Sequence, residues 1–126
     1  MSLTDLCIMA NNIMFRRLLI SYYMYQTSYT DSAWAAKISN PQNRLDTVRP
    51  AVENLGGKIE TAFYCFGEHD IMFICIFPDN ISARAISMAA FSAGNLTAVK
   101  VTPLLTIEEA ITGMEMASKG SISPPS

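Results

Sequence analysis

The hydrophobic and polar positions of this chain change their period several times along its length. Four stretches rich in aromatic and β-branched residues predict strands, which cover residues 18–27, 58–66, 71–77 and 96–105. In the second strand, Ile59, Thr61 and Phe63 are expected to share one face. The third is apolar at every position, both on the side of Phe73 and on the side of Ile74. A strand of this kind needs cover on both faces.

Between the first two strands the pattern becomes helical. Residues 33–55 are predicted to form two helical pieces, because Asn40 precedes a proline and is therefore pushed out of the helical region. The second piece carries a single apolar stripe with helical spacing, made of Leu45, Val48, Val52 and Leu55. We expect this stripe to pack against the sheet.

Two further helices are predicted nearer the C-terminus. Asp79 supplies a side-chain oxygen for the first turn of a helix that runs to about residue 92. Its inward stripe is expected to consist of Ile81, Ala85, Met88 and Ala89. Thr106 and Glu109 form a capping box, which predicts a short terminal helix that ends by residue 120.

The order of these elements predicts the fold. Strand, helix, strand, strand, helix, strand is the ferredoxin-like βαββαβ arrangement of the α+β class. Right-handed crossovers place both helices on one face of a four-stranded antiparallel sheet, with the strands in the spatial order 4-1-3-2. The other face stays open although the third strand is apolar there. A second copy packed sheet against sheet is the simplest cover, so the chain itself is the expected partner, as a homodimer or larger homo-oligomer.

Length and composition narrow the class of protein. A chain of 126 residues has room for one domain with one core. Half of the residues are hydrophobic, which excludes a disordered chain. The net charge of -2, without a basic patch, argues against nucleic acid and against a membrane surface as partners. No apolar run reaches the roughly 18 residues that a membrane span needs.

The cysteines and the two ends of the chain complete this outline. Cys7, Cys65 and Cys75 are odd in number and lack the spacing of metal ligands. We interpret them as free thiols and expect a cytoplasmic location. Residues 1–16 are interpreted as an N-terminal appendage, residues 17–118 as the ferredoxin-like domain and residues 119–126 as a disordered tail.

Several short motifs occur in an order and spacing known from one family. They are Tyr29-Thr-Asp31, Pro41-Gln-Asn-Arg44-Leu45-Asp46, Leu55-Gly56-Gly57-Lys58, Ala62-Phe63-Tyr64 and Gly67-Glu68-His69-Asp70-Ile71. Over about residues 18–116 the chain resembles the GYD domain, a family of small bacterial proteins. The resemblance implies a dimeric α+β barrel and no established activity. In the turn after which the family is named, Gly67 and Asp70 match, whereas His69 stands where a tyrosine is expected.

The turn also holds the candidate catalytic residue. His69 is the only histidine and lies between Glu68 and Asp70, so it could act as a general base or a ligand-binding group oriented by a carboxylate. Alternatively, it is an exposed turn residue. Asp70 is expected to accept hydrogen bonds from backbone donors of the Gly67–His69 turn.

Aromatic residues give the candidate binding site. Tyr23, Trp34 and Tyr64, together with His69 and Asp70, could line a pocket between the sheet and the helices. The same rings suit a core or an interface equally well. Arg44, near Asp46 and Arg49, is interpreted as part of a solvated helix face. No metal ligand set, phosphate loop or dinucleotide fingerprint is found, so no cofactor is expected.

Two functions from different classes follow. The first is a small-molecule binding or regulatory module without catalysis. The second is a cofactor-free enzyme, comparable by fold alone to monooxygenases and dehydratases of this shape. A pocket of several hundred Å³ that reaches His69 or Tyr23 would favour a ligand or substrate site in the barrel, whereas a packed interior would favour a module without one.

Overall fold

The computed structural model describes residues 20–120 and 122–124. Its four strands form one antiparallel sheet, made of β1 (Ser21–Tyr29), β2 (Lys58–Tyr64), β3 (Ile71–Phe77) and β4 (Leu96–Leu104). The spatial order β2-β3-β1-β4 is the predicted order read from the opposite edge. The ferredoxin-like α+β fold is therefore confirmed. The predicted appendage at residues 1–16 lies outside the described residues.

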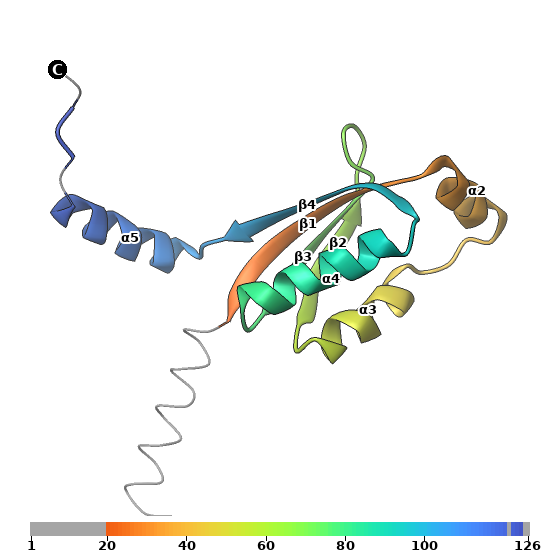
Figure 1. Cartoon of the computed structure of the whole chain (residues 1–126), viewed down its shortest axis with the longest axis horizontal. Coiled ribbons are helices and arrows are strands. Elements are labelled where there is room, and N and C mark those ends of the chain that lie inside the picture. The colour runs from red at the N-terminus through yellow and green to blue at the C-terminus, as the bar shows by residue number, and fades with distance from the viewer. Residues whose placement is uncertain (1–19, 121, 125–126) are drawn as a thin grey trace, which may run out of the picture.

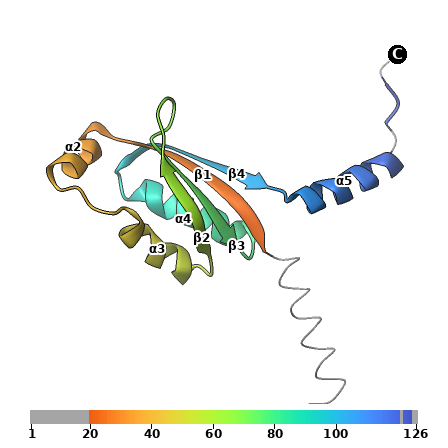
Figure 2. The same ribbon diagram turned by 180° about the vertical axis from the view of Figure 1, so that it is seen from behind.

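The helices are divided unequally between the two faces of the sheet. Both α3 (Leu45–Asn54) and α4 (Asn80–Ser92) lie on one face, while α2 (Asp31–Ser39) lies beyond the end of the sheet (Figure 1). Among the described residues, no helix covers the opposite face (Figure 2). As predicted, α2 and α3 are separate, and Asn40 is the C-cap of α2. None of the helices within the described range is long and apolar enough to cross a membrane.

The core lies between the helices and the covered face of the sheet. Alternate residues of β1 and β3 are buried there, including Tyr25, Phe73 and Phe77. The ring of Phe77 is 0% exposed and meets the ring of Tyr25 edge-on, with centroids 6.2 Å apart. The predicted stripe of α3 is confirmed, with Val52 in the core and its other members packed against it. Gly57 lies so close to Phe77 that an added Cβ would come within 2.4 Å of the ring.

A bulge in β2 changes the predicted orientation of that strand. Ile59 pairs with Cys75, whereas Thr61 pairs with Ile74, so one extra residue, Glu60, lies between the two pairs. The bulge places Ile59 on the covered face and Thr61 on the open one. The prediction that they share a face was wrong, because it assumed an uninterrupted alternation.

The inward face of α4 also differs from the prediction. The buried residues are Ala83, Ile86 and Ser87, whereas Ile81 is 82% exposed and Met88 is 56% exposed. Small side chains at two of the three buried positions let the helix approach the sheet closely. Since apolar residues occur on every side of this helix, their spacing alone did not identify the inward side.

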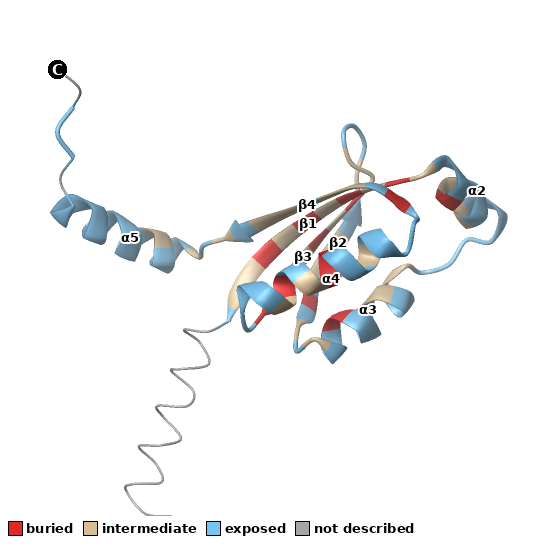
Figure 3. Ribbon diagram, in the orientation of Figure 1, coloured by how far each residue is buried: buried red, intermediate tan, exposed pale blue. Residues whose placement is uncertain are grey.

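The open face of the sheet is apolar at its centre and carries one lysine on each edge strand, of which Lys58 lies 3.8 Å from the carboxylate of Glu60. Its central residues, which include Met24, Ile74 and Ile76, are only partly buried (Figure 3). Lys58 of β2 and Lys100 of β4 share this face, because they pair with Ile76 and Gln26. The apolar centre of this face is therefore without a partner inside the described chain.

The terminal helix α5 (Ile107–Lys119) is a second unpartnered surface. It begins with the predicted capping box of Thr106 and Glu109. It projects past the end of β4, and none of its residues is buried (Figures 1 and 3). Ile107, Ile111 and Met114 recur at helical spacing and are all exposed. A helix of this length is marginal on its own, so its apolar stripe needs packing to be stable.

Candidate binding site

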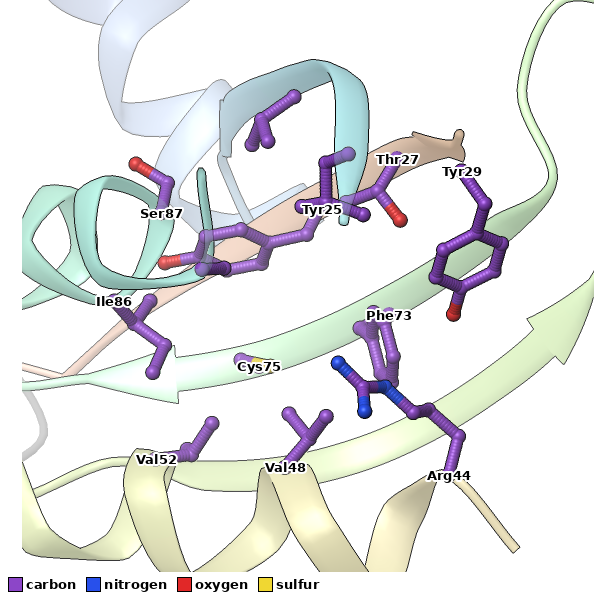
Figure 4. Close-up of a pocket in the computed structure, with 13 residues that line it drawn as sticks. Tyr25, Thr27, Tyr29, Arg44, Val48, Val52, Phe73, Cys75, Ile86 and Ser87 are labelled. Atoms are coloured by element: carbon purple, nitrogen blue, oxygen red, sulfur yellow. The ribbon is translucent and has the colours of Figure 1, made fainter. Parts of the chain in front are cut away.

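A small cavity lies between the covered face of the sheet and helices α3 and α4. Its volume is about 60 Å³, and its walls are mostly apolar, with Val48, Val52, Phe73 and Cys75 among them. Figure 4 shows that Arg44 enters this space from the start of α3, with its guanidinium directed towards Phe73. A charged group in such surroundings is an unusual feature, because apolar walls do not compensate its lost hydration.

The cavity adjoins a larger and more polar cleft. Tyr29 and Arg44 line both spaces, and the cleft has a volume of about 280 Å³. Its remaining walls come from α2, from the loop between α2 and α3, and from Asn95. They provide amide groups at Asn40, Gln42, Asn43 and Asn95. Small-molecule sites combine an apolar pocket with a few polar groups in this way.

Tyr29 lies at the junction of the two spaces. The Nζ atom of Lys37 lies 4.2 Å from the centre of its ring, and the ring of Trp34 meets it edge-on at 5.5 Å. Burial, followed by the charge of Tyr64, raises the pKa of the Tyr29 hydroxyl to about 12, although the Arg44 guanidinium acts in the opposite direction. Tyr29 is therefore a neutral hydrogen-bonding group at neutral pH.

Arg44 and Lys37 form a pair of neighbouring cations. Burial, and secondly the charge of Arg44, lower the pKa of Lys37. Within the described residues, no carboxylate lies within 4.0 Å of either cation. The interpretation of Arg44 as part of a solvated helix face was wrong, because its side chain is half-buried and turns inward.

Three predicted site residues, Trp34, Tyr64 and Asp70, meet beside this cleft. The rings of Trp34 and Tyr64 are 6.4 Å apart. The Oδ2 atom of Asp70 accepts hydrogen bonds from the backbone N–H of Tyr29 at 2.8 Å and from the indole N–H of Trp34 at 3.3 Å. Asp70 is thus a structural acceptor, as predicted, but its backbone donor belongs to β1 rather than to the Gly67–His69 turn.

Tyr23 and His69 lie elsewhere. The hydroxyl of Tyr23 donates to Asn80 Oδ1, and six residues of β1, about 20 Å, separate Tyr23 from Tyr29. The Nδ1 atom of His69 lies 3.3 Å from the hydroxyl of Ser28, whose side chain points to the open face because it alternates with Tyr29.

His69 matches neither of its two interpretations fully. Its side chain is only 11% exposed, so it is not a freely solvated turn residue, and it does not line the cavity. Its other ring nitrogen lies 4.0 Å from the exposed carboxylate of Glu68. The Ser28 hydroxyl and the Glu68 carboxylate are therefore the polar groups beside its ring, and neither of them lines the cavity or the cleft.

The described residues give little support for a metal site or for a reactive thiol. Across residues 20–120, no three His, Cys, Asp or Glu side chains gather where they could hold a metal ion. Cys65 and Cys75 are both free, as predicted. Burial raises the pKa of the Cys75 thiol to about 12, so this thiol is neutral and unreactive.

Fold and site together define a ferredoxin-like α+β domain with a polar cleft beside a small apolar cavity. The GYD domain matches residues 23–114, which is more than half of the chain. The chain therefore belongs to the GYD domain family, as its motifs indicated.

The remaining comparisons are with individual proteins. Among solved structures, the crystal structure of MtbAldR is similar to this chain, with 15% identity and a TM-score of 0.49. The match covers 68% of this chain and 52% of that one, so the chain spans about half the length of the structure it matches. No curated protein matches the chain.

Arg44 is the residue of the candidate site that sequence reasoning missed. It occupies the N-cap of α3 and makes no side-chain capping bond. A cation is unfavourable at this end of a helix, where the backbone dipole is positive. An arginine in place of the usual Ser, Thr, Asp or Asn at a predicted helix start was the available signal.

Proposed function

We propose that this protein is a homodimeric module that binds a small molecule in the cleft around Tyr29 and Arg44. One observation carries the binding proposal: the Arg44 guanidinium enters a mostly apolar cavity that adjoins an open polar cleft. A half-buried cation without a carboxylate partner costs stability, and a ligand would compensate that cost. The free thiols support a reducing location such as the cytoplasm.

A binding module is better supported than a cofactor-free enzyme. The candidate catalytic residue His69 faces away from the cavity, and Tyr23 lies at the far end of β1. Trp34, Tyr64 and Asp70 remain beside the cleft, where they hold Tyr29 in place through packing and a hydrogen bond. These contacts suit recognition rather than proton transfer.

A pair of cleft variants tests the binding proposal. Ala36 lines the cleft and is exposed, whereas Ala35 is exposed on the same helix without lining it. Fragments that bind the wild-type protein should shift the NMR resonances of Tyr29, Trp34 and residues 40–44. Ala36→Phe should abolish these shifts by filling the cleft, and Ala35→Phe should preserve them. Fragments that bind Ala36→Phe unchanged, or that map elsewhere, would refute a site in the cleft.

The dimer is supported by the two unpartnered surfaces. Each large apolar side chain left in water forfeits roughly 1.5–3 kcal/mol, and the open face carries several. Pairing the open faces about a two-fold axis would cover both copies at once. We propose that α5, which projects away from its own sheet, then packs against the partner, with its flanking Glu108 and Glu115 near the lysines at the sheet edges.

A further inference from the structure

The charge and shape of the cleft allow the ligand class to be named. We infer that the ligand carries a carboxylate that binds between Lys37 and Arg44, joined to a short apolar group that enters the cavity beneath Arg44. This inference rests on the proposed binding in the cleft and deepens it.

The position of the two cations supports an anionic group. Lys37 and Arg44 line the same cleft, Lys37 lies over the ring of Tyr29, and the described carboxylates lie farther than 4.0 Å from both. Asp70, on the other side of Tyr29, is already occupied by two hydrogen bonds. Two like charges repel each other, so an anion between them would remove the repulsion and form two charge-assisted contacts.

The polar residues that line the cleft also support an anionic ligand. Asn40, Gln42, Asn43 and Asn95 line the cleft, and each of their side chains offers N–H donors to a bound oxyanion. The Tyr29 hydroxyl remains protonated far above neutral pH and is a further donor. The residues that line the cleft therefore include two cations and several N–H donors but no carboxylate, which is an arrangement that suits an anion.

The apolar cavity distinguishes the carboxylate from other anions. Its volume of about 60 Å³ corresponds to about four water-sized atoms, and its walls are mostly apolar. A carboxylate joined directly to a short hydrocarbon places its planar head against the planar guanidinium and its tail in this space. A phosphate group would meet the same cations, but it would not fill the apolar cavity.

The indole of Trp34 provides an NMR signal with which ligand binding at this site can be measured. Trp34 is the only tryptophan, and its ring lies 5.5 Å from that of Tyr29, so its indole N–H resonance reports on this site. Titration of the full chain with isovalerate should shift this resonance. Isovaleramide has the same apolar group without the charge and should bind at least about tenfold more weakly, since a charged hydrogen bond contributes about 1.5–3 kcal/mol.

Matched arginine variants assign the effect to Arg44. Arg44→Gln should lower the affinity for isovalerate at least about tenfold, whereas Arg49→Gln, exposed on the same helix, should change it by less than about twofold. Arg44→Lys keeps the charge without the planar fork and should give an intermediate loss. Thermal melting of each variant confirms folding. If Arg44→Gln is unfolded, the Arg44→Lys result decides.

The outcomes separate this inference from the binding proposal. Equal affinity for isovalerate and isovaleramide, with both lost in Ala36→Phe, would overturn the carboxylate and leave the cleft as a binding site. An equal loss in Arg44→Gln and Arg49→Gln would overturn the role of Arg44. No response to isovalerate, while other fragments bind in the cleft, would overturn the ligand class alone. No response to any fragment would refute both proposals.

Discussion

The two faces of the sheet are made by the same strands and differ in what covers them. On the covered face, Phe77 is 0% exposed and packs against two tyrosine rings. On the open face, its neighbour Ile76 is only partly buried, although it is equally apolar. The alternation of β3 therefore divides its apolar side chains, because one set builds the core of a single chain and the other set is left without cover inside the described chain.

The difference between the two faces also explains where the candidate binding site lies. The covered strand β1 ends at Tyr29, where α2 and the loop that follows it line an open cleft. Space remains between rigid elements, as is usual for ligand sites. We therefore propose recognition of small molecules for the covered face and assembly for the open one.

The largest expected effect comes from the core. Phe77→Ala should lower the free energy of unfolding by about 3–5 kcal/mol, because it leaves a cavity beside Tyr23 and Tyr25. Urea denaturation measures this loss, which should not depend on protein concentration. Ile76→Ala on the open face should give a smaller loss that does depend on concentration, because it weakens the dimer. If both losses behaved alike, the distinction between the faces would fail.

Variants of Asp70 and His69 allow the two faces to be compared at the turn between β2 and β3. Asp70→Ala should lower the free energy of unfolding by about 1–3 kcal/mol, since the N–H groups of Tyr29 and Trp34 lose their acceptor. His69→Ala removes the contact with Ser28 and a longer one with the exposed carboxylate of Glu68, and it should cost less, about 0.5–1.5 kcal/mol. Thermal denaturation of both variants gives the ranking. A larger loss for His69→Ala would contradict the structural role of Asp70.

Alanine substitutions at two glycines compare a closely packed position with an open one. Gly57→Ala should destabilise the protein by about 1–3 kcal/mol, because its new Cβ would overlap the ring of Phe77. Gly113→Ala in α5, where the new Cβ would have no neighbour within 4 Å, should stabilise that helix by roughly 0.5–1 kcal/mol. Differential scanning calorimetry measures both shifts. A neutral Gly57→Ala would show that the contact between Gly57 and Phe77 is loose.

At neutral pH the last change has no expected effect, because it appears only at alkaline pH. Because the folded-state pKa of Tyr29, about 12, exceeds the ordinary value of about 10, its contribution to stability is complete below pH 10 and is lost as the pH rises towards 12. The groups around it are Tyr64, Asp70, Arg44 and Lys37. Tyr29→Phe should reduce the fall of the melting temperature between pH 10 and 12, and buried Tyr25 and Cys75 should retain part of it. An unchanged profile would refute this contribution.

Sequence patterns predicted elements better than orientations. The strands, the two-part helix and the caps at Asp79 and Thr106 follow from local chemistry, and all are confirmed. The inward side of α4 was not predictable because Ile81 and Met88 are as apolar as Ile86, and only the sheet decides among them. The bulge at Glu60 reversed the faces of β2 without any sequence signal that we recognised.

The residues of the candidate site were likewise predicted only in part from the sequence. Trp34, Tyr64 and Asp70 were expected in one site and do meet, because α2 and the β2–β3 turn both close the end of β1. His69 adjoins Asp70 in sequence, but the turn directs its ring to Ser28, whereas the Asp70 carboxylate accepts from Tyr29 and Trp34. Arg44 turns inward because the loop after α2 brings the start of α3 to the cavity, a long-range effect that local spacing does not record.

The mass of the protein in solution tests the central claim, that the open face is completed by a second copy. At micromolar concentration, light scattering should give about twice the chain mass of 13.9 kDa. Ile74→Asp, which adds a charge at the centre of the open face, should give a folded species near 13.9 kDa, whereas Ala89→Asp on the exposed side of α4 should remain dimeric. A wild-type protein that stays at 13.9 kDa at these concentrations would contradict the account.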